Sequence, residues 1–179
     1  MAKVLVIRLS AIGDVAMTVP VIYSAAKANP EDSFTVLTQA FLMPLFMNRP
    51  PNVEVIGINT KGAEKGLIGL LKFISALLKF DFDVILDLHN VIRTIIICTF
   101  FRLNGKRVFV LDKARKERKR LTAIKGKRLY PLRPVIVRYA DVFRAAGLNY
   151  TETFTSLYEE SPAELSGICL LYTSDAADE

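Results

Sequence analysis

Five short apolar runs rich in β-branched residues recur along this chain, and segments with the periodicity of helices separate them. This alternation predicts a parallel sheet, because consecutive parallel strands need a long crossover connection, which is usually a helix. The chain has 179 residues, of which 51% are hydrophobic and 23% charged, so it can bury one substantial core. We expect strands at residues 3–7, 34–38, 53–58, 83–88 and 107–111, and helices at residues 14–28, 41–47, 67–80, 92–103 and 134–146.

The connection after the first predicted strand, RLSAIGDVAMTVP (residues 8–20), places a carboxylate at the carboxyl edge of the sheet. Loops at this edge line the ligand crevice of parallel α/β proteins, so Asp14 is a candidate functional residue. The helix dipole also favours an acidic residue in a first turn, which is a purely structural explanation. Ser10 can cap the same helix, and Gly13 can supply backbone freedom or let a ligand approach closely. Pro20 should kink or restart the helix.

This first loop lacks the common nucleotide-binding motifs. It holds one glycine, whereas the dinucleotide fingerprint needs three and the P-loop ends in Gly-Lys-Ser/Thr. The missing glycines argue against a nucleotide-dependent oxidoreductase, which is an alternative that shares the alternation of strands and helices.

The strand, the segment RLSAIGDVAMTVP and the helix resemble the beginning of glycosyltransferase family 9, the bacterial lipopolysaccharide heptosyltransferases. The Gly-Asp pair followed by an apolar residue and Thr-x-Pro carries the resemblance, and VRYADVF (residues 137–143) extends it, so that it covers about residues 1–158. The resemblance implies an α/β fold with a Rossmann-like parallel sheet and helices on both faces, the N-terminal half of a GT-B glycosyltransferase. It also implies that Asp14 is the catalytic base. The other candidate substrate-binding residues of this loop are Ser10, Ala11, Gly13 and Thr18.

A second polar cluster follows the fourth predicted strand, in the segment DLHNVIRT. Asp87, His89, Asn90 and Arg93 fall near the same edge of the sheet and are candidate substrate-binding residues. Arg93 offers a fork of donors suited to a carboxylate or phosphate on a sugar acceptor. The structural alternative is that Asn90 caps the next helix and Arg93 is merely solvated. Members of the family more often have Gln-Gly where this chain has His89 and Asn90, so the identity of the acceptor sugar is open.

The segment at residues 113–128 concentrates the positive charge of the chain. It contains nine basic residues and one acidic residue, whereas the net charge of the whole chain is only +6. We expect a solvated, mobile loop that binds a polyanion electrostatically. It has no interleaved aromatic residues for base stacking, so we expect no nucleic acid partner, although a polyanion- or RNA-binding α/β domain is the alternative function. The basic residues are Lys113, Arg115, Lys116, Arg118, Lys119, Arg120, Lys125, Lys127 and Arg128.

The resemblance further implies an inverting sugar transfer. Asp14 would take the proton of an acceptor hydroxyl as this oxygen attacks the anomeric carbon of ADP-heptose or a related ADP-sugar. We expect no cofactor and no metal, an acceptor from the lipopolysaccharide inner core, and a cytoplasmic protein peripheral at the inner face of the inner membrane, where basic residues near anionic lipid each add about 1 kcal/mol. The donor would bind to a second domain, so this chain alone should be nearly inactive.

Other features of the chain fit this expectation. The cysteines Cys98 and Cys169 and the single histidine do not form a metal-ligand pattern, and the apolar stretch around Cys98 favours its burial. No apolar run reaches the roughly 18 residues that a membrane-spanning helix needs, and the N-terminus lacks a signal-peptide pattern.

The last residues need a separate interpretation. CLLYTSDAADE (residues 169–179) resembles the translation of a transposase-type sequencing adapter, so we exclude it from fold reasoning. We therefore expect an acceptor-side domain at residues 1–158, the start of an interdomain region at 159–168, and a donor-binding domain that continues beyond Ile168 in the natural protein.

Overall fold

The computed structural model describes residues 1–60, 62, 65–122 and 131–157. The predicted domain boundary at residue 158, the interdomain region at 159–168 and the expected adapter remnant at 169–179 lie outside the described residues. Lys125, Lys127 and Arg128 of the basic segment also lie outside them.

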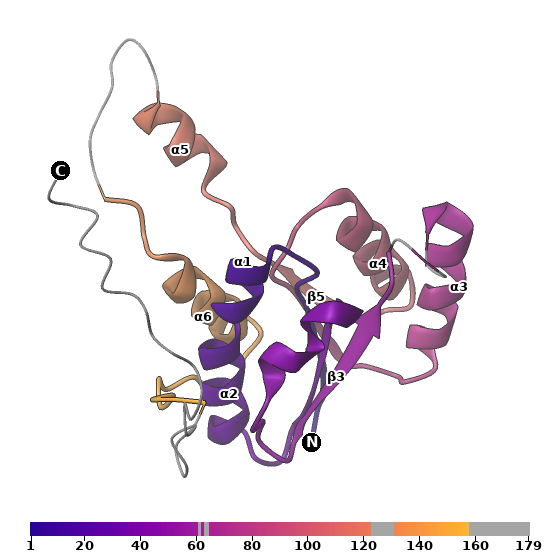
Figure 1. The fold of residues 1–179 in the computed structure, drawn as a ribbon, viewed down its shortest axis with the longest axis horizontal. Helices are drawn as coiled ribbons and strands as arrows, with labels where there is room; N and C mark the ends of the chain where they lie inside the picture. Colours follow the sequence, from indigo (N-terminus) through magenta and orange to yellow (C-terminus); the bar gives the residue numbers. More distant parts are fainter. Residues whose placement is uncertain (61, 63–64, 123–130, 158–179) are drawn as a thin grey trace, which may run out of the picture.

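A five-stranded parallel sheet with the strand order β3-β2-β1-β4-β5 forms the centre of the molecule (Figure 1). Because β1 lies in the middle of the order, the first loop of the chain is at the centre of the carboxyl edge. Val4 of β1 pairs with Phe34 of β2 on one side and with Val84 of β4 on the other. The strands are β1 (Lys3–Ile7), β2 (Ser33–Gln39), β3 (Val53–Ile58), β4 (Val84–Asp87) and β5 (Arg107–Val110).

Helices cover both faces of the sheet, which confirms the predicted architecture (Figure 1). Alternate residues of β1 point to opposite faces, because side chains alternate along a strand. Val4 and Val6 pack with α1, α2 and α6, whereas Leu5 and Ile7 pack with α3 and α4. The helical elements are α1 (Ile12–Ala16), α2 (Val19–Ala28), the 3₁₀ helix η1 (Ala40–Phe46), α3 (Gly66–Leu78), α4 (Ile92–Leu103), α5 (Arg115–Leu121) and α6 (Val135–Ala145).

The helix predicted at residues 14–28 is two helices, as the position of Pro20 indicated. Proline is tolerated in the first turn of a helix, where its missing N–H costs no hydrogen bond. Pro20 occupies that position in α2, and the hydroxyl of Thr18 donates to the carbonyl of Val15 at 2.6 Å across the break. The break leaves α1 as a short helix whose first turn contains Asp14.

The basic segment begins as a helix and not as the loop that its charge predicted. Residues Arg115–Leu121 form α5, because Arg, Lys, Glu and Leu are all good helix formers. None of its residues is buried. The charge of the segment therefore correctly indicated exposure but not backbone conformation.

Candidate active site

The carboxylate of Asp14 lies at the carboxyl edge of the sheet and forms an ion pair with Arg8. Arg8 directly follows β1 and is buried, and its Nη1 donates to the carbonyl oxygen of Leu88 at 2.6 Å. The guanidinium also lies over the ring of Tyr139, 5.9 Å from the ring centre. The side chain of Asp14 stays 41% exposed. Arg8 thus holds a carboxylate that solvent and ligands can still reach.

Asp87 shapes the second loop from inside. It is the last residue of β4 and is buried, and its Oδ1 accepts the backbone N–H groups of His89 (2.9 Å) and Asn90 (2.8 Å). Its Oδ2 accepts the hydroxyl of Thr94 at 2.8 Å, and the thiol of Cys98 lies 3.8 Å away. The proposed contact of Asp87 with substrate is therefore corrected: this carboxylate orders the loop and is not open to a ligand.

His89 connects the two loops. Its Nε2 lies 3.4 Å from the hydroxyl oxygen of Ser10, so the hydroxyl does not cap the first helix as predicted; Ala11 occupies that capping position. Burial, and then the positive charges of Arg8 and Lys113, lower the pKa of His89 to about 4. The imidazole is consequently neutral at physiological pH and can donate or accept a hydrogen bond.

A cavity of about 380 Å³ lies beside Asp14. It brings together Asp14, Ser10, Ala11 and His89 from the two loops that the sequence singled out. Lys113 and Arg118 of the basic segment reach the same cavity. Leu111 and Val135 add apolar surface. Three further residues complete the lining, Arg8, Arg138 and Tyr139; they lie in the two segments that carry the family resemblance but were not among the candidate site residues.

Besides Asp87, four of the candidate substrate-binding residues lie outside this cavity. Thr18 is fully buried and its hydroxyl bonds to Val15, so the expected contact with substrate is corrected. Gly13 lies within α1, with open space where a Cβ would be, so neither packing nor backbone conformation requires a glycine there. Asn90 donates to the carbonyl of Leu111 at 3.1 Å and does not cap α4, which begins after Val91. Arg93 is half-buried in the first turn of α4.

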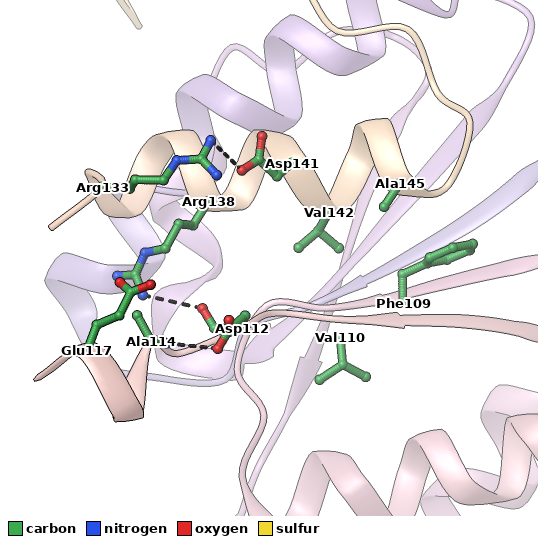
Figure 2. Close-up of a pocket in the computed structure, with 10 residues that line it drawn as sticks. All are labelled: Phe109, Val110, Asp112, Ala114, Glu117, Arg133, Arg138, Asp141, Val142 and Ala145. Carbon is green, nitrogen blue, oxygen red and sulfur yellow. Dashed lines mark hydrogen bonds and ion pairs between the residues drawn. The ribbon is translucent and has the colours of Figure 1, made fainter. Parts of the chain in front are cut away.

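Two more hollows adjoin the cavity along the basic segment. Asn90, Lys113 and the start of α5 line one of about 430 Å³. The other, of about 260 Å³, lies between β5 and α6, with apolar side chains, Phe109, Val110 and Val142, toward one end and charged side chains toward the other (Figure 2). In Figure 2 Arg133 pairs with Asp141, while the side chain of Arg138 extends from α6 to the backbone carbonyl of Asp112.

Neither a metal site nor a membrane span is found in the part of the chain that the structure describes. Its His, Cys, Asp and Glu residues form no group of three that could hold a metal ion. None of its helices is both long enough and apolar enough to cross a bilayer.

Comparison with solved structures finds the same arrangement of strands and helices in known glycosyltransferases. A glycosyl transferase family 9 protein from Veillonella parvula superposes with a TM-score of 0.60 at 21% identity, over 83% of this chain and 42% of that one. The E. coli heptosyltransferase WaaC, solved with ADP, superposes with a TM-score of 0.57 at 22% identity, over 86% of this chain and 49% of that one. This chain has the fold of the family 9 glycosyltransferases.

The E. coli ADP-heptose lipopolysaccharide heptosyltransferase II is also similar, with a TM-score of 0.50 at 21% identity over 78% of this chain and 39% of that one. No family model matches the sequence, and no curated protein matches it. The chain spans half or less of the length of these solved structures. The GT-B, Rossmann-like architecture predicted from the sequence is confirmed, with this chain corresponding to part of the larger enzymes.

Proposed function

We propose that this chain is the acceptor-binding half of an inverting glycosyltransferase of family 9 and that Asp14 is its catalytic base. The observation that carries the proposal is the accessible carboxylate of Asp14 beside a cavity of about 380 Å³, at the edge of the sheet where parallel α/β proteins bind ligands. The fold shared with family 9 glycosyltransferases supports it.

The chemistry needs one proton acceptor and one leaving group. The acceptor hydroxyl oxygen forms a bond to the anomeric carbon of an ADP-sugar while the bond from this carbon to the diphosphate oxygen breaks, and ADP departs with the bonding electron pair. Asp14 takes the hydroxyl proton. Because a carboxylate is a weak base, the transfer occurs late, when the attacking hydroxyl has become acidic in the transition state.

The geometry around Asp14 supports this role. Arg8 pairs with Oδ2 of the carboxylate, and the side chain of Asp14 stays 41% exposed, so an acceptor hydroxyl can reach it. The neutral His89 and the hydroxyl of Ser10 are beside it in the cavity and can hydrogen-bond to a sugar. Cationic groups that stabilise the negative charge of the departing diphosphate would belong to a second, donor-binding domain. We therefore expect this half alone to transfer little sugar.

The finer assignments are part of the same proposal. The donor is ADP-heptose or a related ADP-sugar, because two of the similar E. coli proteins are named for ADP or ADP-heptose. The acceptor is a lipopolysaccharide inner-core precursor. The exposed basic helix α5 is suited to an anionic membrane surface, where the protein would act peripherally on the cytoplasmic side.

The test is sugar transfer by the full-length protein carrying Asp14→Asn. General-base removal should lower kcat by at least about 100-fold while donor affinity changes little, and loss of the ion pair with the buried Arg8 should lower the thermal stability. Glu31→Gln is the matched control, because Glu31 is an exposed carboxylate in the turn before β2, at the opposite edge of the sheet. Transfer by Asp14→Asn within a few-fold of the Glu31→Gln rate would refute the assignment of the base.

A further inference from the structure

Unpaired polar atoms gather at the cavity beside Asp14. Among the described residues, five buried side-chain nitrogen or oxygen atoms have no hydrogen-bond partner. Four of them belong to residues that line this cavity: Arg8 Nε, His89 Nδ1, Arg138 Nε and the hydroxyl of Tyr139. A buried polar group without a partner costs about 1–3 kcal/mol, so four around one cavity indicate a ligand that supplies partners.

The charge of the lining indicates what kind of ligand this is. Four cationic side chains and one carboxylate face the cavity, and Arg8 already neutralises the carboxylate. No ion pair of Lys113 or Arg118 occurs within the described part of the chain, and Arg138 donates to the backbone carbonyl of Asp112 at 3.3 Å. Burial, and then the nearby charges of Arg115 and Arg8, lower the pKa of Lys113. An anion would relieve this crowding of positive charge.

Tyr139 is the most constrained of these groups. It is fully buried in the first half of α6, with its ring under the guanidinium of Arg8. Burial raises the pKa of its hydroxyl, which therefore stays protonated and can donate a hydrogen bond. Arg138 is the preceding residue, so α6 presents a neutral donor and a cation next to each other.

We propose that Arg138 and Tyr139 of α6 form the recognition site for an acid group of the acceptor, a carboxylate or a phosphate monoester. Tyr139 donates to one oxygen of the acid group, and Arg138, with Lys113 and Arg118, balances its charge. Fixing the acid group at α6 orients the acceptor hydroxyl toward Asp14, which lowers the entropic part of the barrier. The identification of the ligand as the acceptor rests on the proposed function. The binding site itself is inferred from the residues that line the cavity.

The test measures binding to this chain without sugar transfer. Amide NMR titrations would use three probes: glucose 6-phosphate for the phosphate, glucuronate for the carboxylate, and glucose as the neutral sugar. We expect one or both charged probes to shift the resonances of the two loops and of α6, and glucose to leave them unchanged. The ratio of the two affinities identifies the acid group. Equal binding of glucose and both charged probes, or no binding of either charged probe, would overturn the proposal.

Substitutions then locate the site. Tyr139→Phe should weaken the charged probe about fivefold to tenfold, and Arg138→Met at least as much. The controls are Tyr150→Phe, which removes a hydroxyl outside the cavity and keeps the ring that contacts Arg144, and Arg133→Met, which removes a charge paired with Asp141 outside the cavity. Both controls should bind like the wild type.

A second measurement separates ligand binding from a structural role. Because the hydroxyl of Tyr139 has no partner in the described structure, Tyr139→Phe should unfold at the same urea concentration as the wild type or a higher one. Weaker binding together with unchanged stability supports recognition by Tyr139. Wild-type binding by both Tyr139→Phe and Arg138→Met overturns the inference, whatever Asp14→Asn does to transfer. Conversely, loss of binding in these variants with normal transfer by Asp14→Asn refutes the proposed base and leaves the binding site in place.

Discussion

His89 makes the stability of this protein depend on pH, and it is the single histidine in the chain. Its pKa is lowered from 6.5 to about 4 by burial and by the charges of Arg8 and Lys113, whereas Asp14 acts in the opposite direction. In the unfolded chain the imidazole takes up a proton as the pH falls below about 6.5, but in the folded protein it does so only near pH 4. Protonation therefore favours the unfolded state in this window, and stability is lost as the pH falls from about 6.5 toward 4.

The size of the effect follows from the two pKa values. A full shift corresponds to about 2.5 kcal/mol of lost stability between pH 7 and pH 4.5. The ring is only partly buried, so solvent screening reduces this to about 1–2 kcal/mol. The window ends near pH 4, below which His89 adds no further pH dependence.

Urea unfolding of the wild type and of His89→Gln, each at several pH values between about 4.5 and 7, measures this contribution. Carboxylates titrate in both proteins, so the difference between the two free energies of unfolding isolates the histidine. We expect the wild type to lose about 1–2 kcal/mol relative to His89→Gln as the pH is lowered. A difference independent of pH, or an imidazole NMR resonance that titrates near 6.5 in the folded protein, would refute the reasoning.

Two further substitutions test how the loops and the sheet are held. Thr94→Val removes the hydroxyl that donates to Asp87 at 2.8 Å and accepts the N–H of Val91 at 3.0 Å, so it should lower the free energy of unfolding in urea by about 2–3 kcal/mol. Thr99→Val, at an exposed position on the same helix, is the control and should cost less than about 0.5 kcal/mol. Equal effects of the two substitutions would show that Asp87 does not need this partner. Gly57→Ala would bring a Cβ to 2.8 Å from the backbone of Ala40, so it should lower the free energy of unfolding by about 1–3 kcal/mol. Gly13→Ala is the control, because its Cβ meets no atom within 4 Å and should not destabilise the fold. If calorimetry found Gly57→Ala as stable as the wild type, the close packing of η1 on β3 would be contradicted.

The fold was largely predictable because its signals are local. β1 and β3 span the residues that their apolar, β-branched runs indicated, since strands covered on both faces need continuous hydrophobic sequence. The start of α2 followed from Pro20. The conformation of α5 was not predictable from its charge, because charge reports exposure to solvent and the same residues are good helix formers.

The candidate site was predictable only where sequence neighbours form it. The loops after β1 and β4 do meet, because parallel strands with adjacent places in the sheet end at one edge. Arg8 could have been noticed in the sequence, because it is a charged residue directly after an apolar strand. Its hydrogen bond to the carbonyl of Leu88 depends on tertiary structure and could not be predicted. Tyr139 lies 125 residues after Asp14 in the printed sequence, in a segment that extended the family resemblance without indicating a site residue. Asp87 and Thr18 were expected to contact substrate, yet both are buried in the fold.

The exposed helix α5 has a consequence for how such proteins diversify. It supplies Arg118 to the cavity but contributes no side chain to either hydrophobic cluster. Substitutions along it therefore change the electrostatic environment of a bound molecule at almost no cost in folding free energy. Substitutions in this one helix can therefore change which charged ligands the cavity binds, while the sheet and loops that hold Asp14 stay the same.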